Sequence, residues 1–190
     1  MPTVKVRIAS AQINPVVGDI AGNSALIEDA IKESLTHGAQ VLLFPEMAMT
    51  GYPVEDLALR PAFRRASIKA VNDVARKAEA LGAGEMLIVL GYLDEDREPQ
   101  NAVALIHRGK VVTKYVKRHL PNYGVFDEFR NFTPGSKSLV VRYSGIDIGI
   151  AICEDIWQDS DAVADLAKRK PGLVLVANAS PYEQIGRAHV

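Results

Sequence analysis

Short apolar runs alternate with amphipathic stretches along most of this chain, and that alternation limits the folds it can adopt. The run Gln40–Phe44 is continuously apolar after its first residue, as in strands covered on both faces, and Pro45 ends it. Apolar or alternating patterns predict further strands over these ranges: Val4–Ile13, Met86–Leu93, Asn101–His107, Val111–Lys117, Leu139–Tyr143, Asp147–Ile152 and Leu173–Ala177. Turn sequences at Arg108-Gly109-Lys110 and Ser144-Gly145 predict that four of these strands form two hairpins.

Three stretches with apolar residues at helical spacing separate the strands. The expected helices run from a cap at Asn23 to Gly38, from Pro61 to Leu81, and from a cap at Asp159 or Ser160 to Arg169. The expected connections are a polar turn and two long loops, at Asp94–Gln100, Glu46–Arg60 and His119–Ser138. Strands that alternate with helices, together with two hairpins, indicate an α/β fold class with a mixed β-sheet flanked by helices.

The composition is that of a globular chain without a strongly charged surface. Of 190 residues, 48% are hydrophobic and 24% are charged, and 22 Lys and Arg against 23 Asp and Glu give a net charge of −1. This balance argues against nucleic acid or an anionic membrane as a partner, and no run of about 18 apolar residues predicts a membrane helix. The N-terminal residues lack the apolar core of a secretion signal. One cysteine, Cys153, excludes an internal disulfide and a Cys-rich zinc site, so we expect no metal and a cytoplasmic protein.

The C-terminal end departs from this pattern. The sequence stops a few residues after the expected strand Leu173–Ala177, and no helix follows that would cover it. The last six residues match the translation of a common sequencing-adapter read. We therefore predict one domain over residues 1–184 that is incomplete at its C-terminal end, followed by a non-native tail over residues 185–190.

Polar residues with complementary chemistry lie at or just after the ends of four of the expected strands. They are Glu46, Lys117, Cys153 and Ser180. Because ligands of open α/β sheets bind outside the carboxyl ends of the strands, these residues are candidates for one site. In such a site Cys153 is the candidate nucleophile, Glu46 the base that accepts its proton, and Lys117 the cation that stabilises an oxyanion.

Each of these three residues also has a simpler interpretation. A lone cysteine beside an apolar strand is commonly a small buried apolar side chain. Glu46 alone fits a solvated loop carboxylate, and Lys117 fits an exposed basic cluster that includes Arg118. Spacing does not exclude His119 as the partner of the thiol either.

Four segments together resemble the glutaminase domains of glutamine-dependent NAD synthetases, a branch of the nitrilase, or carbon–nitrogen hydrolase, superfamily. They are Phe44–Leu57 (FPEMAMTGYPVEDL), Lys117–Glu128 (KRHLPNYGVFDE), Cys153–Trp157 (CEDIW) and Asn178–Tyr182 (NASPY). The run that ends at Glu128 is specific for this branch, whereas the Pro-Glu and Cys-Glu pairs indicate only the superfamily. The resemblance extends from Met1 to about Gln184 and implies an α-β-β-α sandwich.

The resemblance implies a role for each candidate. Cys153 attacks the side-chain amide of glutamine to form a thioester, Glu46 transfers the proton, and Lys117 stabilises the oxyanion. The residues implied to shape the glutamine pocket are Tyr52, Tyr123, Phe126, Glu154 and Ser180. The family also carries a basic residue shortly after Ser-Pro-Tyr, where this chain has Gly186, inside the predicted tail.

The resemblance also implies partners beyond this domain, which itself is expected to need no cofactor. Ammonia from glutamine would pass to a C-terminal synthetase domain, which uses ATP with Mg to amidate nicotinic acid adenine dinucleotide and yield NAD. A homo-oligomer is expected. The alternatives are a free-standing nitrilase-superfamily amidase acting on another small amide, and a catalytically inactive binding module. The presence of Glu46, Lys117 and Cys153 together argues against the second alternative.

Overall fold

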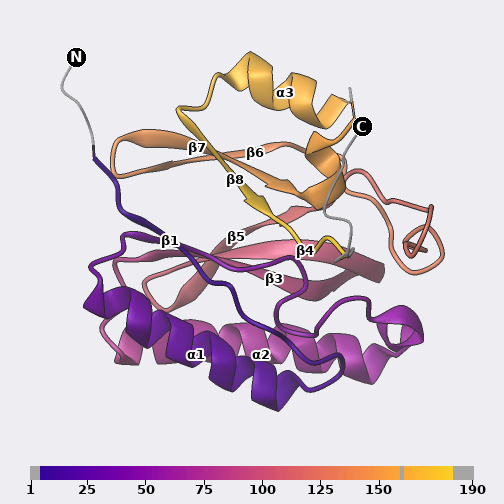
Figure 1. Cartoon of the computed structure of the whole chain (residues 1–190), viewed down its shortest axis with the longest axis horizontal. Helices are drawn as coiled ribbons and strands as arrows, with labels where there is room; N and C mark the ends of the chain where they lie inside the picture. Colours follow the sequence, from indigo (N-terminus) through magenta and orange to yellow (C-terminus); the bar gives the residue numbers. More distant parts are fainter. Residues whose placement is uncertain (1–4, 159–160, 182–190) are drawn as a thin grey trace.

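The chain folds into layers, with two β-sheets inside and helices outside (Figure 1). The computed structural model describes residues 5–158 and 161–181. Helices α1 (Ile20–Thr36) and α2 (Pro61–Ala80) cover one face of a five-stranded sheet, and a three-stranded sheet packs on its other face. Helix α3 (Asp161–Arg169) lies outside the three-stranded sheet. This arrangement confirms the predicted fold class of mixed sheets flanked by helices in an α-β-β-α sandwich.

Both sheets are mixed. The five-stranded sheet contains, in spatial order, β1 (Ile8–Ser10), β2 (Val41–Leu43), β3 (Leu87–Asp96), β4 (Glu98–His107) and β5 (Lys110–Val116). The three-stranded sheet contains β6 (Leu139–Tyr143), β7 (Ile146–Ile152) and β8 (Leu173–Ala177). Strands β1 to β3 run parallel, β3 to β5 antiparallel, β6 and β7 antiparallel, and β7 and β8 parallel. The two predicted hairpins are confirmed as β4–β5 and β6–β7.

The helix starts show which local signals were decisive. Helix α2 begins at Pro61 as predicted, because a proline in the first turn costs no helical hydrogen bond. The predicted cap of α1 at Asn23 is wrong, since Asp19 caps this helix and accepts a hydrogen bond from the Gly22 N–H. Asn23 lies inside the first turns of α1, where it is buried. The predicted cap of α3, Asp159 or Ser160, lies outside the described residues, as does the predicted tail over 185–190.

Two predicted boundaries in the five-stranded sheet are also wrong. Within Val4–Ile13, β1 covers only Ile8–Ser10, which are the residues that pair with β2. The range Asp94–Gln100 is not a long polar turn but the end of the β3–β4 hairpin, which reverses at Arg97. The polar residue Asp94 is tolerated within this hairpin because it is buried as the ion-pair partner of Lys114 in β5.

Two apolar clusters hold the layers together. One lies between the five-stranded sheet and helices α1 and α2. The other fills the space between the sheets, with Val89 and Leu105 on one side and Ile150 and Leu175 on the other. Burial of apolar surface stabilises such layers by roughly 25 cal/mol per Å². Cys153 belongs to the second cluster, so the fold places the thiol where the two sheets meet.

Candidate active site

The candidate catalytic residues come from strand ends in both sheets. Glu46 follows β2, and Lys117 follows β5 in the five-stranded sheet. Cys153 follows β7 of the three-stranded sheet and begins a short 3-10 helix, η2 (Cys153–Ile156). Because these strands end on the same side of the sandwich, three residues far apart in sequence approach one another.

A buried cluster of opposite charges forms the first half of the site. The Lys117 Nζ donates to Glu46 Oε1 at 2.7 Å and to Glu128, whose two carboxylate oxygens lie 3.0 and 2.9 Å away. The three side chains are 1 to 3% exposed. Although burial opposes the charge, the two carboxylates raise the pKa of Lys117 above its ordinary value, so it stays an ammonium. The interpretation of Lys117 as an exposed surface lysine is therefore wrong.

Glu128 is a member of this cluster that the sequence reasoning quoted only as the end of a motif. It also accepts a hydrogen bond from the Tyr52 O–H at 2.9 Å. Burial raises the pKa of Glu128 to about 7, against the opposing effect of Lys117. A carboxyl at position 128 had no local signal beyond the motif, because it lies in the aperiodic loop 119–138, and the fold alone brings it to Lys117.

A glycine in β3 explains how Glu46 reaches this cluster. A Cβ atom at Gly91 would lie 2.2 Å from the Pro45 carbonyl oxygen and 2.5 Å from the Met47 nitrogen. The segment that carries Glu46 therefore packs directly on the β3 backbone, where the Met49 N–H donates to the Gly91 carbonyl at 3.0 Å. Only glycine leaves room for this close approach.

Cys153 forms the second half of the site. Its backbone has a φ of 40°, a conformation that is unfavourable for a residue with a side chain and that is often found at functional positions. The Sγ atom lies 4.0 Å from Ser180 Oγ. Burial and the nearby Glu46 carboxylate together raise the pKa of the Cys153 thiol to about 11, although Lys117 and Ser180 act to lower it. The resting group is therefore a thiol that needs a base, and both charged partners lie close enough to affect it.

Asp155 connects the two halves. Its Oδ1 accepts from the backbone N–H groups of Arg118 and His119 at 3.0 and 2.9 Å, just after Lys117. Its Oδ2 accepts from the Tyr115 O–H at 2.8 Å and from the Ile152 N–H at 3.0 Å, just before Cys153. One buried carboxylate thus ties the end of β5 to the end of β7. Such bonds to an ionised group are among the stronger hydrogen bonds in proteins.

A cavity of about 550 Å³ opens beside Glu46. Three of the predicted pocket residues line it: Tyr52, Phe126 and Ser180. The other two, Tyr123 and Glu154, adjoin it. The Tyr123 O–H donates to Glu154 Oε2 at 2.8 Å, and the Tyr123 ring contacts the Phe126 ring edge-on. The cavity has the size of ordinary small-molecule sites.

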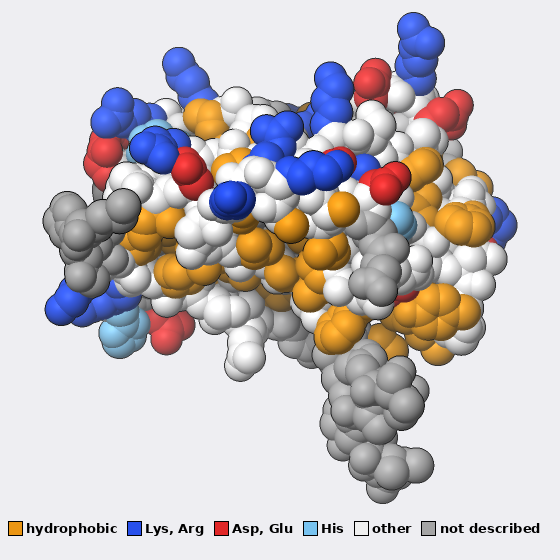
Figure 2. Space-filling view, turned by 90° about the horizontal axis from the view of Figure 1, so that it is seen from above, with side chains coloured by type: hydrophobic (Ala, Val, Ile, Leu, Met, Phe, Trp, Pro, Cys, Tyr) orange, Lys and Arg blue, Asp and Glu red, His pale blue; other side chains and the backbone are white. Residues whose placement is uncertain are grey.

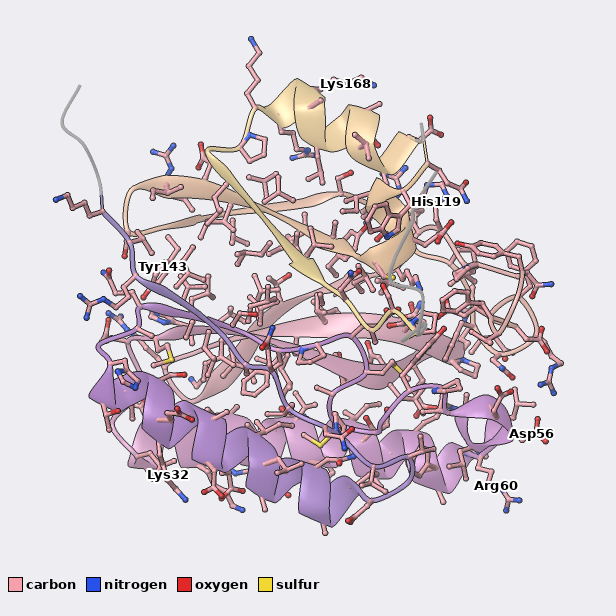
Figure 3. The ribbon with its side chains drawn as sticks, in the orientation of Figure 1. Lys32, Asp56, Arg60, His119, Tyr143 and Lys168 are labelled. Carbon is pink, nitrogen blue, oxygen red and sulfur yellow. The ribbon has the colours of Figure 1, made fainter. Side chains whose placement is uncertain are left out.

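His119 lies at this end of the sandwich but faces a different space (Figure 3). Its side chain lines a smaller cavity together with Phe129, Phe132 and Gln158. The lining of that cavity includes neither Cys153 nor Glu46. Glu46 lies close enough to the Cys153 thiol to raise its pKa, and this proximity favours Glu46 over His119 as the base.

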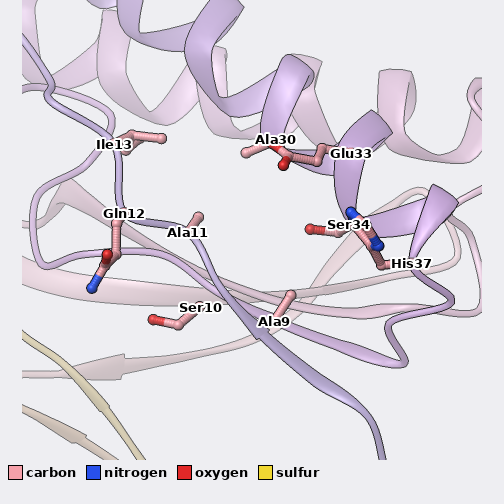
Figure 4. A pocket seen from close by; sticks show the side chains of 9 residues that line it. All are labelled: Ala9, Ser10, Ala11, Gln12, Ile13, Ala30, Glu33, Ser34 and His37. Carbon is pink, nitrogen blue, oxygen red and sulfur yellow. The ribbon is translucent and has the colours of Figure 1, made fainter.

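A further cavity, of about 290 Å³, lies between β1 and α1 (Figure 4). Ala9, Ala11 and Ile13 point towards the helix, whereas Ser10 and Gln12 point to the other side. Its lining includes neither Glu46 nor Ser180, the two residues by which the larger cavity adjoins the charged cluster and the thiol.

The surface of the described residues adds two observations. On the face seen from above, basic and acidic side chains are interspersed, next to a band of apolar ones (Figure 2). Among the described residues, no helix combines the length and apolar character needed to cross a bilayer.

Comparisons with known proteins identify the family that this chain resembles. The model of the carbon–nitrogen hydrolase family matches residues 7–189. A glutamine-dependent NAD(+) synthetase of Thermotoga maritima is 40% identical over 180 residues, which are 94% of this chain and 31% of that protein. One from Acinetobacter baylyi is 38% identical over 179 residues, or 93% of this chain and 32% of that protein. The chain thus spans about a third of the length of these relatives.

Solved structures give the same result. The glutamine-dependent NAD+ synthetase of Acinetobacter baumannii, in complex with ADP, superposes with a TM-score of 0.82 at 35% identity, covering 93% of this chain and 32% of that one. An amidase from Nesterenkonia sp. superposes with a TM-score of 0.79 at 25% identity, covering 97% of this chain and 68% of that one.

Proposed function

Since the family model matches residues 7–189, this chain belongs to the carbon–nitrogen hydrolase family, and from that premise we propose that it hydrolyses the side-chain amide of glutamine. The observation that carries the proposal is the convergence of Glu46, Lys117 and Cys153 beside a cavity for a small molecule. The similarity to glutamine-dependent NAD(+) synthetases supports the choice of glutamine among amides.

The first chemical step forms a thioester. Glu46 accepts the proton of the Cys153 thiol while the sulfur attacks the amide carbon, which suits a thiol whose pKa of about 11 keeps it protonated at neutral pH. Negative charge then develops on the carbonyl oxygen. An ammonium has three N–H donors, and in the described part of the chain Glu46 and Glu128 use two of those on Lys117. The third remains available to donate to the oxyanion.

The next steps release ammonia and glutamate. As the tetrahedral intermediate collapses, the C–N bond breaks and Glu46 returns its proton to the leaving nitrogen, which departs as ammonia. Glu46 then takes a proton from water, whose oxygen attacks the thioester carbon. The C–S bond breaks, glutamate leaves, and the proton on Glu46 returns to the Cys153 sulfur, so that the site is regenerated.

The residues around the cavity have the chemistry to hold glutamine. Tyr52, Phe126 and Ser180 line the space in which its side chain would lie. The Glu154 side chain lies behind Tyr123 and accepts hydrogen bonds from Tyr123 and Gln158, and as an acidic group it is suited to the substrate ammonium group. Phe126 contacts both Tyr52 and Tyr123 through its ring, which gives this part of the pocket an aromatic wall.

We propose that the ammonia serves a synthetase domain in the same polypeptide. That domain would use ATP with Mg to amidate nicotinic acid adenine dinucleotide, and the whole enzyme would act in the cytoplasm as a homo-oligomer. The support is the length of the relatives, of which this chain spans about a third. A predicted domain end at residue 184, with a non-native tail after it, stays a prediction.

The alternative is a free-standing amidase that acts on another small amide. It is favoured by the likeness to the Nesterenkonia amidase, which extends over 68% of that chain. A mutant of that amidase carries acrylamide added to its active-site cysteine. The same three residues of this chain would serve both reactions, so the substrate distinguishes the two proposals.

The test measures ammonia release from glutamine, asparagine and acetamide, and NAD formation in the polypeptide that contains this chain and its synthetase domain. We expect glutamine to be preferred, and Cys153→Ala to abolish NAD formation from glutamine while added ammonium restores it. Unchanged use of glutamine by Cys153→Ala contradicts the nucleophile assignment. A preference for acetamide over glutamine supports the amidase alternative.

A further inference from the structure

A buried asparagine lies directly beside the charged cluster and has no role in the mechanism given above. Asn101 belongs to β4, and its side chain and backbone are 1% exposed. Its backbone carbonyl oxygen accepts a hydrogen bond from the backbone N–H of Lys117 at 2.9 Å. Asn101 and Lys117 are thus neighbours across the β4–β5 hairpin, and the backbone fixes both side chains relative to each other.

The amide of Asn101 duplicates the contacts of Lys117. Its Nδ2 donates to Glu46 Oε1 at 2.7 Å and to Glu128 Oε1 at 3.2 Å. The Lys117 Nζ donates to the same two oxygens, at 2.7 and 3.0 Å. The two carboxylates are therefore bridged by one charged and one neutral donor. Their charges exceed that of the single ammonium, so a second donor is needed to hold them together.

The orientation of this amide has a cost to the fold. The Asn101 Oδ1 is buried and has no hydrogen-bond partner among the described residues. A buried acceptor without a partner is unfavourable. If the amide were turned over, however, Oδ1 would face the carboxylate oxygens of Glu46 and Glu128. The two carboxylates thus fix the direction in which the N–H groups point, at the expense of the other end of the side chain.

We propose that Asn101 is a positioning residue, whose amide holds Glu46 and Glu128 together and keeps Glu46 in the anionic form that accepts the thiol proton. The inference rests on the proposed function for the role of Glu46. The contacts on which it is based are independent of the substrate.

The groups that face this cluster come from several elements. Lys117 approaches from the end of β5, Tyr52 from the loop after Glu46, and Cys153 from the start of η2. None of the three is a neutral donor to both carboxylates. Loss of the Asn101 amide therefore leaves the anions with Lys117 and Tyr52, and favours protonation of one carboxylate.

The first experiment measures stability, which needs no substrate. We compare the free energy of unfolding of the wild type, N101L and N101S between about pH 5 and about pH 8. The expected result is a loss of stability that grows as the pH rises, because the anionic carboxylates lose a donor that the protonated ones need less. N101S removes the amide but leaves room for water, and carries the test if N101L does not fold.

Asn23→Leu is the matched control. Asn23 is buried as fully as Asn101, but its side chain bonds only to the backbone of Val16 and Met49 among the described residues. Its substitution should lower stability equally at all pH values. If the stability lost by N101L and by N101S is the same at every pH, as expected for the Asn23→Leu control, the proposal is overturned.

The second experiment measures the pH dependence of glutamine hydrolysis. For N101L we expect kcat to fall about 10- to 100-fold, KM to change by less than about twofold, and the acid limb of kcat/KM to move up by about one pH unit. N101D replaces the donor with a third carboxylate and should move the limb further. A uniform fall without movement of the limb contradicts the proposal. If the wild type shows no Cys153-dependent hydrolysis, the proposed function fails, while the stability experiment still decides on Asn101.

Discussion

The two halves of the site are built in different ways. In the half carried by the five-stranded sheet, Glu46 and Glu128 are buried, and the buried Lys117 bonds to both of them at 2.7 to 3.0 Å. In the half carried by the three-stranded sheet, Cys153 has an unfavourable backbone conformation and a Ser180 contact as long as 4.0 Å. The groups that handle protons and charge are thus organised before a substrate arrives. The nucleophile is held by its backbone, and its buried side chain makes only the long contact with Ser180 and one with the backbone of Ala179 among the described residues.

This contrast makes the connection between the halves important. Asp155 bonds to backbone next to Lys117 and to backbone next to Cys153. Of the four predictions that follow, two test the charged half, one tests the connection and one tests the mouth of the pocket.

The largest effect is expected from Lys117→Met. It leaves two buried carboxylates without their cation, which we expect to cost about 3–5 kcal/mol of unfolding free energy, together with nearly all activity. Denaturant unfolding at neutral pH measures the loss. Lys69→Met is the matched control, because the Lys69 side chain is 76% exposed and its partner, Asp73, is itself 31% exposed. That control should cost about 1 kcal/mol or less, and equal losses for the two variants would show that the charged half is not special.

Asp155→Asn should have the next largest effect. The new amide places a donor where donors already point, so we expect a loss of about 1–3 kcal/mol and a fall in kcat of about 100-fold. Asp165→Asn serves as the control, since Asp165 is 37% exposed and bonds to Arg118 and Lys168 at the surface. The prediction is wrong if kcat is retained while stability falls, because the connection would then support the fold only.

Glu128→Gln tests the pH dependence of the charged half. Burial raises the pKa of Glu128 from 4.5 to about 7, so the folded protein binds this proton more tightly than the unfolded chain. Its contribution to stability is complete below about pH 4.5 and is lost as the pH rises through about 7. The variant should show a flatter stability profile in this window and about tenfold lower activity. Unfolding curves at several pH values check this, and an unchanged slope would assign the dependence to other groups.

The smallest effect is expected from Tyr123→Phe at the mouth of the pocket. Tyr123 is 57% exposed, and its hydrogen bond to Glu154 raises the pKa of its hydroxyl to about 12. Removing the hydroxyl leaves the Glu154 carboxylate held by Gln158 without Tyr123, so KM for glutamine should rise by about two- to fivefold, with stability within about 0.5 kcal/mol of the wild type. Steady-state kinetics measure the change. A larger effect on kcat than on KM would place Tyr123 nearer to the reacting atoms.

The sequence predicted the positions of Glu46, Lys117 and Cys153 because each follows an apolar strand, and strand ends are visible locally. It did not reveal Asn101 or Asp155, since their partners come from other strands and the bonds exist only in the folded chain. The division of eight strands into two sheets was likewise invisible in the periodicity, because each strand looks the same whichever layer it joins. The start of α1 was misplaced because Asp19 and Asn23 are both good caps, and only the buried contacts of Asn23 separate them.

The thiol is attached to one layer of the sandwich and its proton acceptor to the other. If the three-stranded sheet moved against the five-stranded one by a fraction of an ångström, the distance from the thiol to Glu46 would change, although no reacting group would be altered. The packing between the two sheets therefore sets the distance over which the thiol proton must move.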